Sequence, residues 1–287
     1  MPERDHYIPG VPCWVDTAQP DPAAGVEFYR GLFAWEFEDV MPPGSGANYY
    51  MARLNGGDVA AVGSIPEGAP QQAAWNTYIA VADADDTAAR VRDAGGTVVS
   101  EPFDVMDAGR MAVVVDPEGA VLSLWQARRM VGASVVNEAG SLNFNSLGTR
   151  SVDAAKAFYG SVFGWSTIDV GGGAEMWTLP GYGDDLERDN PDLRKMVAES
   201  GGPPGFEDVV AAINPIADDE PDTPPNWSVT FATDDADATA ARAAELGGTV
   251  VVPPLDAPWV RMTVLQDPQG ATFIASQFVP ENKDMEG

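Results

Sequence analysis

Apolar and polar positions follow the same order twice in the first half of the chain. Residues 10–65 contain a strand-like stretch, a stretch with helical spacing and three more strand-like stretches, and residues 75–128 repeat this order. In the second helical stretch Val91 and Ala94 share one face, and Gly95-Gly96 follows as a stop signal. Each run therefore predicts a βαβββ unit.

The predicted element boundaries follow from these patterns. The first unit has strands at 12–18, 35–40, 48–54 and 58–65 and a helix at 22–33, and the second has strands at 76–81, 97–105, 111–116 and 120–126 and a helix at 85–94. The sequence Asp116-Pro117-Glu118-Gly119 between the last two strands is typical of a tight turn. We therefore expect these two strands to form a hairpin.

The second half of the chain repeats landmarks of the first half in the same order. The pairs are Phe28-Tyr29 with Phe158-Tyr159, Gly95-Gly96-Thr97-Val98-Val99 with Gly247-Gly248-Thr249-Val250-Val251, and Asp116-Pro117 with Asp267-Pro268. Three ordered matches indicate an internal duplication. We therefore predict four βαβββ units in two domains, 1–130 and 131–287, which join near 128–139.

The second copy is longer than the first between Trp165 and Trp227. Asn190-Pro191 is typical of a helix start, with Pro191 at the first helical position, and Gly201-Gly202 is typical of a helix end. We predict one short extra helix in an insertion near 180–206. This insertion is either a lid over a pocket or a decorated connection.

The landmarks resemble the vicinal oxygen chelate superfamily, which comprises glyoxalases, bleomycin-resistance proteins and extradiol dioxygenases. The most specific stretch is PCWVDTAQPDPAAGVEFYRGLFAWEFE at 12–38, and the chain is most similar to two-domain actinobacterial-type members. The resemblance implies an α+β fold of tandem glyoxalase-like domains, in which each pair of units forms a curled half-barrel sheet around a cavity. It also implies that metal-dependent members bind a divalent metal through His, Gln or Glu side chains of central strands.

The positions of the family's metal ligands hold weak ligands in this chain. Counting from the landmarks places them at Trp14, Asn76, Ser123, Phe144, Ser228 and Ile274. A shift of one residue adds only Cys13 and Asn143. The one histidine, His6, precedes the first strand, and imidazole sites need two or more converging histidines. We therefore predict no metal and no other cofactor, although an all-carboxylate site for Mg²⁺ or Ca²⁺ is an alternative.

Aromatic and small polar residues occupy the predicted cavities instead. The candidate ligand-binding residues are Trp14, Tyr50, Asn76, Tyr78, Ser123 and Trp125 in the first domain, and Phe144, Trp177 and Ser228 in the second. Because side chains alternate along a strand, Trp125 shares the face of Ser123. Such walls suit a flat hydrophobic or aromatic small molecule. The alternative is that these aromatic residues are core, as we expect for Trp35 and Trp165.

Two arginines occupy matching places in the repeat. Arg110 and Arg261 each precede a strand that ends in Asp-Pro. They either clamp a carboxylate or phosphate of the ligand or form internal salt bridges, and salt bridges are the more common outcome. Of the two cavities, we expect the first to be open, because Asn76, Tyr78 and Ser123 offer polar contacts.

Composition narrows the function classes further. The net charge of −28 disfavours nucleic acid and anionic membranes as partners, and no apolar run is long enough to span a membrane. Cys13 is the only cysteine and there is no signal region, so we expect a cytoplasmic protein without an intrachain disulfide.

The sequence favours a metal-free small-molecule binding protein of the sequestration or resistance type. One alternative is a glyoxalase-like lyase or isomerase, or another cofactor-independent enzyme. A further alternative is a non-catalytic interaction or stress protein with filled cavities. A buried acidic group in a cavity would favour the enzyme. We expect a monomer or a weak homodimer.

Overall fold

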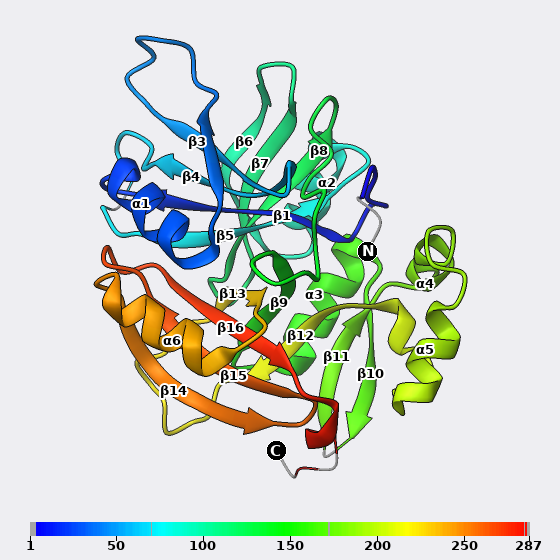
Figure 1. Ribbon diagram of the computed structural model, residues 1–287. Helices are drawn as coiled ribbons and strands as arrows, with labels where there is room; N and C mark the ends of the chain where they lie inside the picture. The colour runs from blue at the N-terminus through cyan, green and yellow to red at the C-terminus, as the bar shows by residue number, and fades with distance from the viewer. Residues whose placement is uncertain (1–3, 70, 172, 284, 286–287) are drawn as a thin grey trace.

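Two eight-stranded mixed sheets make up most of the protein (Figure 1). The computed structural model describes residues 4–69, 71–171, 173–283 and 285. The first sheet contains residues of the first predicted domain and the second sheet contains residues of the second. Both sheets curl without closing, which confirms the α+β fold with tandem domains.

The first sheet has the strand order β2-β3-β4-β1-β5-β8-β7-β6. Its first unit comprises β1 (Pro12–Gln19), α1 (Pro22–Phe33), β2 (Glu36–Asp39), β3 (Tyr49–Leu54) and β4 (Gly57–Ser64). Its second unit comprises β5 (Ala74–Ala80), α2 (Ala84–Asp93), β6 (Thr97–Val105), β7 (Gly109–Val115) and β8 (Val121–Ala127). The two units meet where β1 pairs with β5 in antiparallel fashion.

The second sheet repeats this order as β10-β11-β12-β9-β13-β16-β15-β14. Its first unit comprises β9 (Leu142–Thr149), α3 (Val152–Phe163), β10 (Ser166–Gly171), β11 (Ala174–Thr178) and β12 (Val209–Pro215). Its second comprises β13 (Asn226–Ala232), α6 (Ala236–Glu245), β14 (Thr249–Ala257), β15 (Val260–Gln266) and β16 (Thr272–Phe278), followed by the 3-10 turn η2 (Pro280–Asn282). The identical order of equivalent strands confirms the predicted duplication.

The insertion in the second domain differs from the prediction. It holds two helices, α4 (Tyr182–Leu186) and α5 (Leu193–Ser200), and the 3-10 turn η1 (Phe206–Asp208). The expected start of a helix at Pro191 is wrong, because α5 begins after Asp192. The expected end is correct: Gly201 caps α5 with a φ of 86°, a left-handed conformation that suits glycine. Five residues are too few to show the helical periodicity that would have revealed α4.

Each sheet has one face covered by helices and one face without them. On β8, Leu122 and Leu124 pack in one core with Ala88 and Val91 of α2. Because side chains alternate along a strand, Ser123 on β8 points away from α2. We call the face of Leu122 and Leu124 the helix-covered face of the sheet, and the face of Ser123 the helix-free face.

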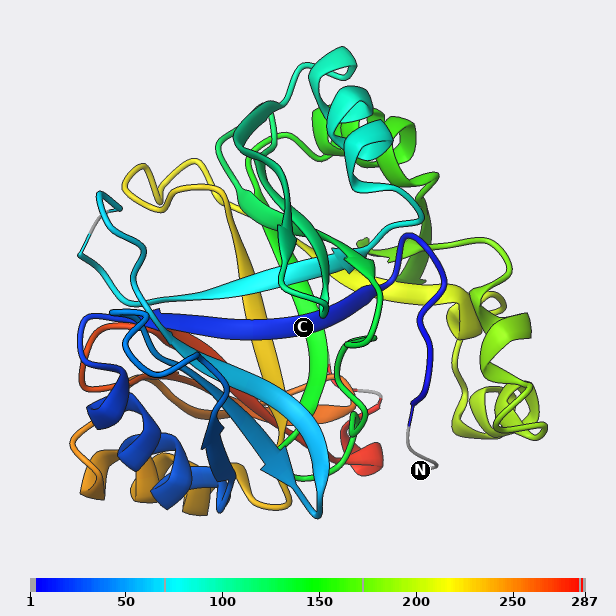
Figure 2. The ribbon, with the colours of Figure 1, turned by 90° about the horizontal axis from the view of Figure 1, so that it is seen from above.

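The helix-covered faces of the two domains pack against each other. Helix α1 lies beside α6, and α2 lies beside α3 (Figure 2). At the centre, the Thr77 hydroxyl of β5 donates a hydrogen bond to the Asn145 carbonyl oxygen of β9 at 3.0 Å. One hydrophobic core therefore joins the first unit to the fourth, and another joins the second unit to the third.

Two buried tyrosine–aspartate pairs connect the domains across these cores. Tyr29 of α1 donates to Asp267 Oδ2 at 2.8 Å, and Tyr159 of α3 donates to Asp116 Oδ2 at 2.9 Å. Each tyrosine hydroxyl also accepts a hydrogen bond from a tryptophan Nε1 at 3.0 Å. The repeated Phe-Tyr and Asp-Pro landmarks of the sequence are thus structural, because each pair joins one domain to the other.

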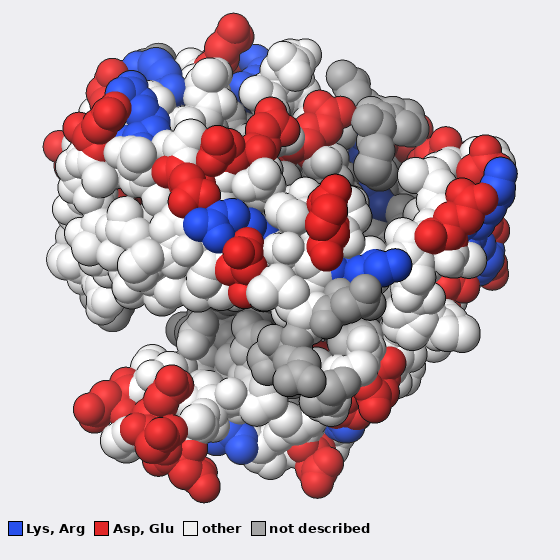
Figure 3. All heavy atoms as spheres, turned by 60° about the horizontal axis from the view of Figure 1, so that its bottom comes forward, with Lys and Arg blue, Asp and Glu red and all other residues white. Residues whose placement is uncertain are grey.

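The surface carries the acidic excess of the sequence. Asp and Glu side chains outnumber Lys and Arg on the face shown in Figure 3. Most of the cations that are present pair with carboxylates, as Arg53 does with Glu38 and Asp58. Within the described residues, no helix is long and apolar enough to cross a membrane.

The tyrosine–aspartate pairs predict a specific loss of stability. Replacing Tyr29 by Phe leaves the buried Trp75 Nε1 without an acceptor and removes one donor from Asp267. We expect the free energy of unfolding to fall by about 1–3 kcal/mol, measured by urea denaturation.

The matched control is Tyr50→Phe, because Tyr50 packs against the same core. Within the described chain its hydroxyl forms no hydrogen bond. This variant should stay within about 0.5 kcal/mol of the wild type. Equal losses in the two variants would contradict the structural role of the pair.

Candidate functional site

Five of the predicted ligand-binding residues lie together on the helix-free face of the first sheet. Trp14 of β1 faces Tyr78 of β5, and Tyr78 faces Ser123 of β8. Asn76 lies two residues from Tyr78 on β5, and Trp125 lies two residues from Ser123 on β8. Both therefore share this face. All but Asn76 are buried, which makes these side chains the floor of the candidate site.

Asp16 is the central residue of this floor, and the sequence analysis missed it. It lies opposite Asn76 on the neighbouring strand, and only 6% of its surface is exposed. Asn76 Nδ2 donates to Asp16 Oδ1 at 2.8 Å, and the hydroxyls of Tyr78 and Tyr49 donate to Asp16 Oδ2 at 2.7 and 2.9 Å. All three partners of the carboxylate are neutral.

Tyr49 extends this network to the indole of Trp14. Its hydroxyl accepts a hydrogen bond from Trp14 Nε1 at 3.1 Å while it donates to Asp16. The Tyr78 and Trp125 rings meet edge-to-face with centroids 6.4 Å apart. The carboxylate is therefore surrounded by aromatic rings that fix its position.

Burial changes the proton affinity of this cluster. Desolvation raises the pKa of Asp16, and the hydrogen bonds from Asn76, Tyr78 and Tyr49 oppose that rise. Burial and the neighbouring Asp16 charge raise the pKa of the Tyr49 and Tyr78 hydroxyls well above the usual tyrosine range. The two tyrosines consequently stay protonated and act as hydrogen-bond donors.

The floor continues into an exposed apolar surface. Val121 and Phe103 share the helix-free face and are 49% and 44% exposed, and Met111 and Val113 between them are half-buried. Exposed apolar groups beside a buried polar cluster are typical of a ligand surface. The alternation of β5 and β8 places Val121 in the same row as Asn76, next to the polar end of the site.

Two of the other predicted aromatic residues, Tyr50 and Trp177, lie outside these surfaces. Tyr50 on β3 packs into the core under α1, and Trp177 on β11 is fully buried with Tyr159 and Trp165. Both therefore belong to helix-covered faces. For Tyr50 the predicted strand contained two adjacent tyrosines, and the register of the sheet places Tyr49 on the helix-free face.

The two repeated arginines also lie on the helix-covered side. Arg110 pairs with Asp85 of α2 and with Asp104, and Arg261 pairs with Asp237 of α6 and with Asp256. The structure thus shows the internal salt bridges that the sequence favoured. These pairs tie each hairpin to its helix and do not face the candidate site.

The second sheet has no polar cluster of this kind at the equivalent place. Phe144, Ser228 and Ile274 lie on its helix-free face, as the repeat predicted. Ser146 stands in the position of Asp16, and Ala174 stands in the position of Tyr49. The second domain therefore lacks both the carboxylate and one of its tyrosine partners.

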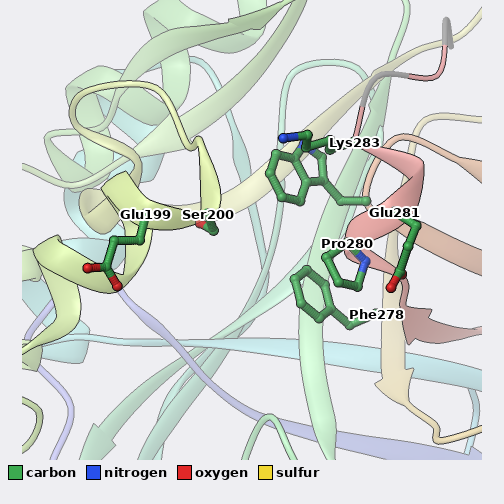
Figure 4. A pocket seen from close by; sticks show the side chains of 7 residues that line it. Glu199, Ser200, Phe278, Pro280, Glu281 and Lys283 are labelled. Atoms are coloured by element: carbon green, nitrogen blue, oxygen red, sulfur yellow. The ribbon is translucent and has the colours of Figure 1, made fainter.

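A separate hollow of about 340 Å³ lies at the edge of the second domain (Figure 4). The Trp259 and Phe278 rings stack across one wall with centroids 6.4 Å apart, and Ser200 at the end of α5 forms part of the opposite wall. The Glu199 side chain points away from Phe278 in Figure 4. The insertion therefore forms part of a hollow here.

Two further residues have reactive side chains: Cys13 packs in one apolar cluster with Trp14, Tyr78 and Trp125, whereas His6 lies in the N-terminal segment. Cys13 is fully buried, and burial raises the pKa of its thiol, which disfavours a nucleophile. His6 bridges Asp5 and Asp185, so it links the N-terminal segment to α4. The pKa of His6 is raised by these two carboxylates.

The donor set of the site does not fit a transition metal. Asp16 is its one carboxylate, and its other polar groups are amide and hydroxyl groups, whereas such metals take three or four ligands, mostly His, Cys, Asp or Glu. No cluster of three such residues occurs anywhere in the described part of the chain. The tyrosine and asparagine contacts already occupy three of the about four acceptor positions of the Asp16 carboxylate, so it has no set of free positions for a metal.

The sequence profile of the Glyoxalase/Bleomycin resistance protein/Dioxygenase superfamily matches residues 14–124 and 141–274. The chain belongs to this superfamily. The two matched regions coincide with the two curled sheets, so both domains of the protein are glyoxalase-superfamily domains.

Two relatives resemble this chain over nearly its whole length. "Putative glyoxylase CFP32" of Mycobacterium tuberculosis is 43% identical over 98% of this chain and 100% of its own length. "Anthracycline biosynthesis protein DnrV" of Streptomyces peucetius is 36% identical over 93% of each chain.

Solved structures show the same fold at low sequence identity. A Mn(II)-bound glyoxalase from Novosphingobium aromaticivorans has a TM-score of 0.59 at 16% identity, over 94% of this chain and 82% of that one. An extradiol ring-cleaving dioxygenase from B. fuscum has a TM-score of 0.60 at 12% identity, over 100% and 77%. These neighbours show the fold alone.

The raised pKa of Asp16 predicts a pH-dependent stability. At low pH the carboxyl is protonated in both the folded and the unfolded chain, so the Asp16 charge does not lower the free energy of unfolding. As pH rises, the unfolded chain ionises first, and the folded state loses stability until the raised pKa is passed. Replacing Asp16 by Asn removes this loss.

We expect the free energy of unfolding of Asp16→Asn, relative to wild type, to increase between about pH 4 and pH 7. Urea denaturation at a series of pH values measures this difference, and Asp58→Asn at a half-buried surface ion pair serves as the control. A relative stability that falls with rising pH would show that Asp16 is stabilised as an anion in the folded state.

Proposed function

We propose that the protein binds a flat aromatic small molecule, without a metal ion, on the helix-free face of its first sheet. The observation that carries this proposal is the Asp16 cluster next to exposed apolar side chains. Asp16, Asn76 and Val121 lie in one row across β1, β5 and β8. A ligand along this row places its polar end at Asp16 and its flat body over Val121.

The aromatic preference follows from other side chains of the same helix-free face. Trp125, Met111 and Phe103 lie side by side on β8, β7 and β6, four residues along β8 from Val121, and provide apolar and polarisable surface. Such groups bind flat apolar molecules through area burial and ring contacts. The name of the 36% identical relative refers to anthracycline biosynthesis, so an anthracycline is a suitable first probe.

A binding experiment with that probe tests the location of the site. We expect Val121→Glu to weaken anthracycline binding at least about tenfold, because a carboxylate would have to be desolvated under the ligand. Thr272→Glu, at the equivalent place on β16, is the matched control and should leave the affinity unchanged. Tryptophan fluorescence quenching measures both affinities. A loss in the Thr272 variant alone would place the site on the second sheet.

The absence of a metal from the binding site has its own test. We expect elemental analysis of the desalted protein to find no stoichiometric transition metal, and EDTA to leave both the melting temperature and the anthracycline affinity unchanged. A metal that binds the folded state stabilises it by mass action, so its removal would lower the melting temperature. One metal per chain together with such a drop would overturn the metal-independent site.

Asp16 also favours a second candidate function, a glyoxalase-like isomerase or lyase that needs no cofactor. A buried carboxylate with a raised pKa is a suitable group to accept a proton from a bound substrate. In that case Asp16→Asn abolishes turnover of an identified substrate while binding persists. Equal turnover in the variant would exclude Asp16 as the base.

A further inference from the structure

The buried carboxylates in this protein differ in how many hydrogen-bond donors and cations contact them. The described chain buries four aspartates, Asp16, Asp116, Asp185 and Asp267. Asp116 and Asp267 each accept four hydrogen bonds from backbone and side-chain donors. Asp185 contacts a histidine and an arginine. Among these described residues, only Asp16 has neither a cationic partner nor four donors.

An ionised carboxylate has about four acceptor positions. Tyr49 and Tyr78 fill the two positions on Oδ2, and Asn76 fills one on Oδ1. One acceptor position on Oδ1 is therefore left. Asp16 keeps 6% of its surface exposed, and its neighbour Asn76 on the helix-free face is half-buried.

Desolvating a charge without a counter-ion is costly, and a cation at that position would offset the cost. The surroundings suit a cation as well. The side chains that contact the carboxylate, Tyr49, Tyr78 and Asn76, are all neutral, so none of them repels an ammonium group. The net charge of −28 of the whole chain draws cations toward the protein.

We propose that Asp16 binds the protonated amine of the ligand, so that the ligand is a primary or secondary ammonium attached to a flat apolar body. This inference rests on the proposed function, because it specifies the chemistry of the ligand's polar end at the same site. The N–H of the ammonium donates to the remaining acceptor position of Asp16 Oδ1. The apolar body lies over Val121.

Two probes of nearly equal shape test the charge requirement. 2-Naphthylmethylammonium carries the cation, and 2-naphthylmethanol offers a neutral hydroxyl donor on the same ring system. We expect calorimetric titration at pH 7 to show the ammonium binding at least about tenfold more tightly, which corresponds to roughly 1.4 kcal/mol. Equal affinities, or no binding of the ammonium, would overturn the inference.

Variants of the cluster assign the preference to Asp16. Asp16→Asn should remove the difference in affinity between the two probes, because the charge-assisted hydrogen bond between the ammonium and Asp16 is lost. It should leave the affinity for the alcohol within about threefold of the wild-type value. Ser146→Ala, at the equivalent position of the second sheet, is the control and should keep the full difference. A preference that survives in Asp16→Asn would come from the overall acidic field and would refute the role of Asp16.

A second variant covers the case in which Asp16→Asn fails to fold. Tyr49→Phe removes one neutral donor from Asp16 and frees a further acceptor position. It should therefore strengthen the preference for the ammonium. A weaker preference in this variant would contradict the inference. The titration of the Val121 and Thr272 variants with an amine-free anthracycline aglycone judges the proposed function separately, since no amine contact at Asp16 is then possible.

Discussion

The two crossed tyrosine–aspartate contacts determine how the two domains of this protein meet. Tyr29 reaches Asp267, and Tyr159 reaches Asp116, so each domain supplies one donor and one acceptor. These groups are buried, and a buried polar group without its partner is costly. The contacts therefore hold the two helix-covered faces together, and the helix-free faces consequently point outward.

Residues of the core between the domains are the same in both copies, whereas residues of the helix-free faces differ. The landmarks Phe-Tyr and Asp-Pro persist in both copies because each copy must complete the core of the other. The helix-free faces carry no such constraint, and Asp16 of the first sheet corresponds to Ser146 of the second. One domain can thus retain a polar cluster while the other domain keeps only the scaffold. Superfamily members share a fold while their sites differ in this way.

Much of the fold could be predicted from the sequence because its signals are local and repeated. Helix α1 spans Pro22–Phe33, as the pattern indicated, and in the structure Asp21 caps it. The five-residue helix α4 had no periodic signal. The site was harder, because it depends on register. The counted positions Trp14 and Asn76 belong to neighbouring rows of the sheet, since Trp14 faces Tyr78 and Asn76 faces Asp16.

Asp16 itself could have been predicted from the sequence. A shift of one residue from Trp14 changes the face of the strand, whereas a shift of two keeps it. Following that alternation would have identified a carboxylate on the predicted cavity wall. Its hydrogen bond to Tyr49 could not have been predicted, because it depends on how β3 aligns with β4 and β4 with β1.

The site therefore combines one buried carboxylate with neutral donors, where metal-dependent superfamily members gather several metal ligands. A crystal structure of the protein with a bound anthracycline tests this account most directly. The account predicts ligand density on the helix-free face of the first sheet, with a polar ligand atom within hydrogen-bonding distance of Asp16 and no metal between them. Density on the second sheet, or a metal ion that bridges the ligand and the protein, would contradict it.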